Sequence, residues 1–171
     1  MKITANKITV ARTALVPVFL VLAYCDLRCI ALAVYVIACL SDYIDGYIAR
    51  RYDQISTFGQ FMDPLADKVL VLSAMCFFVE RGQMPGWAVA VVLVREFAVS
   101  GLRLLAAGQG NVIAADISGK IKTVATMICL GAMLVFSQTA AVNILGTAVI
   151  VITTLYSGAH YFLKNKDVFK V

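Results

Sequence analysis

Charged residues are scarce in this chain of 171 residues. Asp, Glu, Lys and Arg make up 15% of it, whereas hydrophobic residues make up 61%, and the mean hydropathy is +0.88. A soluble domain is typically less than half apolar and carries about 25% charged residues. The composition therefore excludes a soluble globule. Apolar segments recur along the whole chain, so we expect a single membrane domain over residues 1–171.

Histidine and paired cysteines are also scarce. The single histidine, His160, lies between aromatic residues, which favours packing at a membrane interface over catalysis. The five cysteines form no C-x-x-C pair, so neither a zinc site nor a disulfide framework is expected. The basic residues do not cluster on one face, and the net charge of +5 therefore indicates membrane topology and no nucleic-acid partner.

Six apolar segments are long enough to form membrane helices, and they predict an all-α integral membrane protein, a bundle of six transmembrane helices. The segments are residues 8–25, 29–50, 60–80, 85–106, 119–138 and 142–163. Basic residues gather at one set of segment ends, whereas only Arg28 and Arg81 flank the other. The positive-inside rule then places both termini in the cytoplasm, in a multi-pass protein of the cytoplasmic membrane.

Four aspartates interrupt the ends of the second and third segments on the expected cytoplasmic side. Asp42 and Asp45 are three residues apart, and Asp63 and Asp67 are four apart, so each pair shares a helix face. The short connection between the segments predicts an antiparallel hairpin in which the four carboxylates converge. Carboxylates facing lipid would be too costly, and the pattern therefore predicts a polar site at the cytoplasmic side.

Four clustered carboxylates need cations to neutralise them. Oxygen ligands without nearby His or Cys favour a hard ion, Mg²⁺ or Mn²⁺. Gly46 and Ala49 leave the inner helix face without bulk, so that a ligand can approach the backbone. Arg50 can offer its planar guanidinium to a phosphate. A metal-dependent phosphate chemistry is the hypothesis that these residues support.

The pattern Asp42-x-x-Asp45-Gly46-x-x-Ala49-Arg50, eight residues, Gly59-x-x-x-Asp63-x-x-x-Asp67 resembles the signature of the CDP-alcohol phosphatidyltransferase family. The resemblance implies two divalent cations held by the four aspartates, with Asp67 also acting as general base. It further implies that Gly46, Ala49, Arg50 and Gly59 surround the CDP group of CDP-diacylglycerol. An alcohol would attack the phosphorus beside the diacylglycerol, and CMP would leave. The resemblance also implies a homodimer.

Two runs in the fourth and fifth segments bear on which alcohol is the acceptor: Arg95 to Leu105 and Gly119 to Met127. Arg95 and Arg103 are eight residues apart and share a helix face. An anionic acceptor such as glycerol 3-phosphate needs two or three cations. Both runs resemble those of the family member that uses glycerol 3-phosphate, and Arg95, Arg103 and Lys122 are therefore the candidate acceptor-binding residues.

Other interpretations remain open at this stage. A sibling enzyme of the same family would use another alcohol, such as inositol phosphate, serine or phosphatidylglycerol. Arg95 could form a structural ion pair with its neighbour Glu96, and membrane topology alone could explain Arg103 and Lys122. Intramembrane acids also occur in cation transporters, although no ionisable residues continue the path across the membrane. A structural bundle that needs the acids only for assembly is the third class.

Overall fold

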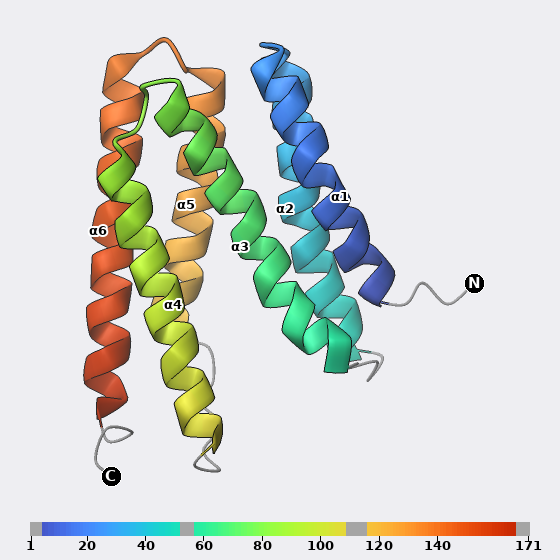
Figure 1. The fold of residues 1–171 in the computed structure, drawn as a ribbon, viewed down its shortest axis with the longest axis vertical. Helices are drawn as coiled ribbons and strands as arrows, with labels where there is room; N and C mark the ends of the chain where they lie inside the picture. Colours follow the sequence, from blue (N-terminus) through green and yellow to red (C-terminus); the bar gives the residue numbers. More distant parts are fainter. Residues whose placement is uncertain (1–4, 52–56, 109–115, 167–171) are drawn as a thin grey trace. The chain divides into compact units, whose positions relative to one another are not determined.

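The computed structural model of the chain describes the backbone of residues 5–51, 57–108 and 116–166, with side chains for residues 13–41, 68–108 and 116–166. These residues form helices and no strand (Figure 1). The six helices of the described ranges are α1 (Ala5–Tyr24), α2 (Arg28–Arg51), α3 (Thr57–Glu80), α4 (Gly86–Gly108), α5 (Ile117–Val135) and α6 (Ala140–Lys164). The predicted all-α fold is confirmed.

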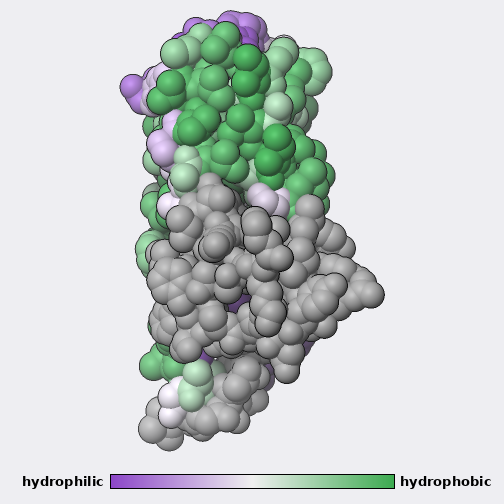
Figure 2. Space-filling model, turned by 90° about the vertical axis from the view of Figure 1, so that its right-hand side faces the viewer, coloured by the Kyte–Doolittle hydropathy of each residue, from purple (hydrophilic) through white to green (hydrophobic). Residues whose placement is uncertain are grey.

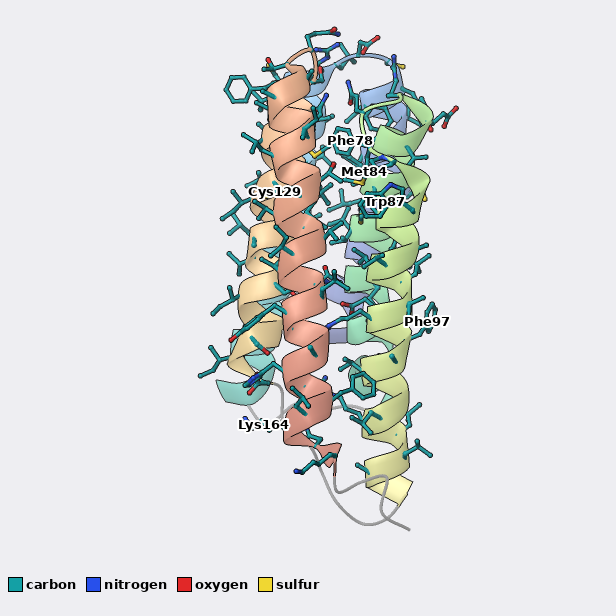
Figure 3. The ribbon with its side chains drawn as sticks, turned by 90° about the vertical axis from the view of Figure 1, so that its left-hand side faces the viewer. Phe78, Met84, Trp87, Phe97, Cys129 and Lys164 are labelled. Carbon is teal, nitrogen blue, oxygen red and sulfur yellow. The ribbon has the colours of Figure 1, made fainter. Side chains whose placement is uncertain are left out.

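The surface of the described residues is rich in large apolar side chains. Figure 2 shows a broad hydrophobic area that ends in hydrophilic residues at one end of the molecule. In the second half of the chain, Phe97 is 71% exposed and projects outward from α4 (Figure 3). Within the described ranges, α5 and α6 are long and apolar enough to cross a membrane. Hydrocarbon is the environment in which so much exposed apolar surface is stable.

The helices fall into two compact units, Met1–Glu80 with Leu134–Phe136, and Arg81–Met133 with Ser137–Val171. In the first unit α1 packs against both α2 and α3. The rings of Phe19 and Tyr35 lie 5.6 Å apart between α1 and α2, and those of Tyr24 and Phe77 meet edge to face between α1 and α3. The Tyr24 hydroxyl also donates a hydrogen bond to the carboxylate of Glu80.

In the second unit α4 packs against α6, with Val99, Leu102 and Tyr161 forming a buried cluster. Helix α5 approaches α6 closely at Gly146, where an added Cβ would lie 3.0 Å from the Sδ of Met133. A glycine at this position therefore lets the two helices come together.

The observed helix ends lie within three residues of the predicted segment ends. Helix α5 ends at Val135, three residues before the predicted end. The carbonyl oxygen of Ser137 accepts hydrogen bonds from the side-chain amides of Gln83 and Asn143, at 2.8 and 3.2 Å. These bonds stabilise a turn at Ser137 in place of a further helical turn. All five cysteines are free, as expected.

Candidate functional site

The aspartate signature lies on two helices that contact each other in the first unit. Asp42 and Asp45 belong to α2 with Gly46, Ala49 and Arg50, while Asp63 and Asp67 belong to α3 with Gly59. Both helical segments were predicted from the sequence, and the helical spacing within each aspartate pair follows from them. The side chains of these eight residues lie outside the described part of the structure, so their convergence stays a prediction.

Two candidate acceptor residues of the second unit, Arg95 and Lys122, form a charged network with Glu96 inside the helix packing. Glu96 on α4 accepts hydrogen bonds at the same oxygen, Oε1, from Nη1 of Arg95 at 3.0 Å and from Nζ of Lys122 on α5 at 2.8 Å. The side chains of Arg95, Glu96 and Lys122 are 11%, 15% and 6% exposed. The ion pair between Arg95 and Glu96, which the sequence offered as an alternative role for Arg95, is present, and Lys122 joins it.

Arg95 also reaches across to α6. Its Nη2 donates a 2.5 Å hydrogen bond to the hydroxyl of Ser157, and lies 3.5 Å from the place of a Cβ on Gly119 of α5. Its Nε is buried and has no hydrogen-bond partner among the described residues. The guanidinium is thus held on two sides, and Nε is among the N–H donors that it does not use within the described residues.

Arg103, the second candidate arginine of α4, contacts α6 one turn after Ser157. Its Nε donates a 2.9 Å hydrogen bond to the Tyr161 hydroxyl, and its guanidinium carbon lies 5.4 Å from the centre of the Tyr161 ring. Tyr161 is 1% exposed, whereas Arg103 reaches the surface. This geometry combines a hydrogen bond with a cation–π contact. The arginine is therefore fixed and still accessible.

A second charged group gathers around Asp116, just before α5. Its carboxylate accepts hydrogen bonds from the backbone N–H and hydroxyl of Ser118 and, at 2.8 Å, from Nζ of Lys164 near the end of α6 (Figure 3). These bonds, chiefly that from Lys164, hold the pKa of Asp116 well below its ordinary value. His160 lies 3.4 Å from the same carboxylate and stacks on Tyr156. Asp116 thus caps α5 and ties it to α6.

Sequence reasoning did not find the contribution of α6 to this network. Ser157 and Tyr161 carry the hydroxyls that hold Arg95 and Arg103, yet they lie in an apolar helix and match no motif. The one available clue is their spacing of four residues, which places both hydroxyls on one face of α6.

Comparison with known proteins bears on the aspartate signature and on the network. A family model described as CDP-alcohol phosphatidyltransferase matches residues 2–156. A protein of Bacillus subtilis (strain 168) named "CDP-diacylglycerol--glycerol-3-phosphate 3-phosphatidyltransferase" is 39% identical, over 96% of each chain. A protein of the same name from Rickettsia typhi is 31% identical over 99% of this chain and 100% of its own.

A third relative, named "Probable phosphatidylglycerophosphate synthase", comes from Mycobacterium tuberculosis (strain ATCC 25618 / H37Rv). It is 38% identical over 74% of this chain and 63% of its own length.

The apolar helices and the family match together define a helical membrane enzyme. The matched family model spans all four signature aspartates as well as Arg95, Arg103 and Lys122. The chain belongs to the CDP-alcohol phosphatidyltransferase family. The family predicted from the signature is therefore confirmed, and so is the prediction of a transferase of phospholipid synthesis.

Proposed function

We propose that this enzyme transfers the phosphatidyl group of CDP-diacylglycerol to sn-glycerol 3-phosphate, forming phosphatidylglycerophosphate and CMP. The observation that carries the choice of acceptor is the charge balance of the candidate acceptor residues and Glu96 in the second unit. Arg95, Arg103 and Lys122 bring three positive charges, and Glu96 supplies one negative charge. A phosphate with about two negative charges near neutral pH would balance that excess. The two relatives that match over nearly the whole chain carry names that include this acceptor.

Two of these cations, Arg95 and Lys122, also suit a phosphate in their geometry. The Nη1 of Arg95 and the Nζ of Lys122 both lie within hydrogen-bond distance of one carboxylate oxygen, so a single phosphate group can contact both. The spare Nε of Arg95 offers a further donor. Glu96 balances only one of the two buried positive charges of Arg95 and Lys122, so an acceptor without an anionic group would leave the other charge uncompensated, which is costly.

Asp42, Asp45, Asp63 and Asp67 are the proposed ligands of two divalent cations, Mg²⁺ or Mn²⁺. The donor set fits such ions, because it consists of carboxylates from two contacting helices, α2 and α3. When bound, the cations would stabilise the negative charge that develops on the pyrophosphate during transfer. In this proposal Gly46, Ala49 and Gly59 leave room for the CDP group, and Arg50 contacts its phosphates.

The reaction itself is a displacement at phosphorus. The acceptor hydroxyl oxygen forms a bond to the phosphorus next to the diacylglycerol, the bond from that phosphorus to CMP breaks, and Asp67 takes the hydroxyl proton. Arg95, Arg103 and Lys122 hold the phosphate end of the acceptor, so that its hydroxyl is presented in a fixed orientation. No covalent enzyme intermediate is needed.

The proposed setting is a homodimer in the cytoplasmic membrane, each chain forming a single domain of six membrane-spanning helices. Both termini and the active site would then face the cytoplasm. The six apolar helices and the gathering of basic residues at one set of segment ends support this topology.

A panel of acceptors tests the function directly. Purified enzyme would receive CDP-diacylglycerol with glycerol 3-phosphate, inositol phosphate, serine or phosphatidylglycerol, and the release of CMP would be followed. Glycerol 3-phosphate is expected to give the highest kcat/KM. Product from another alcohol and none from glycerol 3-phosphate would refute the proposed acceptor and keep the family chemistry.

A further inference from the structure

The two candidate arginines of α4 are each fixed by a hydroxyl of α6. Arg95 donates to Ser157 and Arg103 donates to Tyr161. Ser157 is 0% and Tyr161 1% exposed, so both hydroxyls are enclosed by protein. A hydrogen bond between a cation and a buried neutral hydroxyl is strong and directional, because water does not compete for either partner. The bonds therefore restrict the orientation of both guanidinium groups.

The spacing of the partners shows what this restriction achieves. Arg95 and Arg103 are eight residues apart, about 12 Å along the axis of α4. Ser157 and Tyr161 are four residues apart, about 6 Å along the axis of α6. Each arginine is thus bonded to a different turn of α6, and these two bonds fix the position of each guanidinium group relative to α6.

Gly158 completes this face of α6. An added Cβ at Gly158 would lie 3.2 Å from the Cγ of Arg95, which is closer than ordinary van der Waals contact. The absence of a side chain thus lets the aliphatic part of Arg95 lie directly on α6. The same contact determines where the guanidinium meets Ser157.

We propose that Ser157, Gly158 and Tyr161 form a template on α6 that positions Arg95 and Arg103 for the acceptor's phosphate. These three residues are positioning residues, because each acts through an arginine. Helix α6 thereby becomes a determinant of acceptor specificity. The inference rests on the proposed function, in which the two arginines bind the acceptor.

The test uses two conservative variants of the full-length enzyme, Ser157→Ala and Tyr161→Phe. Each removes one hydroxyl and leaves the helix packing nearly unchanged. Loss of a hydrogen bond to a charged group is expected to raise the KM for glycerol 3-phosphate about tenfold. The KM for CDP-diacylglycerol and the melting temperature are expected to stay close to the wild-type values.

Matched controls exist for both changes. Thr154→Val removes a hydroxyl from the same helix, one turn before Ser157; Thr154 is 0% exposed and its Oγ1 has no partner among the described residues. Tyr35→Phe removes a hydroxyl from a buried tyrosine of α2 in the first unit. Both controls are expected to leave the KM for glycerol 3-phosphate unchanged.

A double-mutant cycle shows whether Ser157 acts through Arg95. In an Arg95→Ala background, Ser157→Ala is expected to cause no further rise in the KM for glycerol 3-phosphate. Equal rises in the two backgrounds would overturn the positioning role. Parallel changes in the KM of both substrates, or unchanged acceptor KM in both single variants, would also overturn it.

The wild-type enzyme separates this inference from the function on which it rests. If wild-type enzyme forms no product from glycerol 3-phosphate, the proposed acceptor is wrong and the template is rejected with it. If the wild type uses glycerol 3-phosphate and the hydroxyl variants match the controls, the template alone is wrong.

Discussion

The Nζ of Lys122 lies 2.8 Å from Oε1 of Glu96, and this ion pair joins α5 to α4 inside the second unit. The Lys122 side chain is 6% exposed, and Glu96 also accepts a hydrogen bond from Arg95 at the same oxygen. A buried ammonium needs a partner, because transfer of an unpaired charge out of water costs several kcal/mol. Glu96 therefore holds two cations of the proposed acceptor site close together while no acceptor is bound.

Glu96→Gln should weaken both the fold and the acceptor site. Removing one partner of a buried pair typically costs about 3–5 kcal/mol, because the other charge is left uncompensated. We expect a lower melting temperature in detergent and a KM for glycerol 3-phosphate raised about tenfold or more. Glu80→Gln is the control, because Glu80 lies at an exposed helix end and its carboxylate bonds to the neutral hydroxyl of Tyr24; it is expected to lose less. Equal behaviour of the two variants would refute the role of Glu96.

Asp116→Asn should destabilise the enzyme in a manner that depends on pH. The folded state lowers the pKa of Asp116 below its ordinary value of 3.8, mainly through the hydrogen bond from Lys164. A carboxylate with a lowered pKa stabilises the fold above the unfolded value, and this contribution is lost as the pH falls through the folded value. The difference in melting temperature between the wild type and Asp116→Asn should thus be largest at pH 7 and become smaller below about pH 4.

The control for this change is Asp26→Asn, in the turn between α1 and α2. Asp26 forms an ion pair with Arg28 at 3.5 Å, and its side chain is 57% exposed. Such surface pairs contribute little to stability. A loss at Asp116 no larger than that at Asp26, or one that does not change with pH, would contradict the assigned role of Asp116 in joining α5 and α6.

Gly146→Val should loosen the contact between α5 and α6. An added Cβ would lie 3.0 Å from Sδ and 3.1 Å from Cγ of Met133, which is itself 0% exposed and has little room to move. Overpacking of this kind typically costs about 1–3 kcal/mol. Gly101→Val, on α4, meets no atom within 4 Å of its Cβ and is expected to cause no loss. Thermal unfolding of the two variants in the same detergent measures the difference.

Asp67→Asn should nearly abolish turnover and leave the helical content intact. The change keeps the side-chain volume but removes a proposed metal ligand and proton acceptor, and loss of a general base typically lowers the rate by about 10²–10⁴-fold. CMP release measures the activity, and circular dichroism checks the fold. Activity near the wild-type level would show that Asp67 is not the base.

Most of the helical layout could be predicted from the sequence. The thickness of the bilayer sets the length of the apolar segments, and charged residues mark their ends, so both features can be read without knowledge of tertiary contacts. The family could be predicted because its signature lies within two neighbouring helices. The role of α6 could not be predicted, since Arg95 and Ser157 are 62 residues apart and only the packing of α4 on α6 brings them together. The early end of α5 likewise depends on Gln83, a distant residue.

The most direct test of the proposed reaction measures two products at once. Purified enzyme would be incubated with CDP-diacylglycerol and glycerol 3-phosphate carrying a radioactive glycerol carbon, with Mg²⁺ or Mn²⁺ and then with excess chelator. We predict one CMP released for each labelled glycerol recovered in the lipid fraction, and neither product with chelator. CMP release without label in lipid would mean that the enzyme does not join the phosphatidyl group to glycerol 3-phosphate, and would contradict the proposed function.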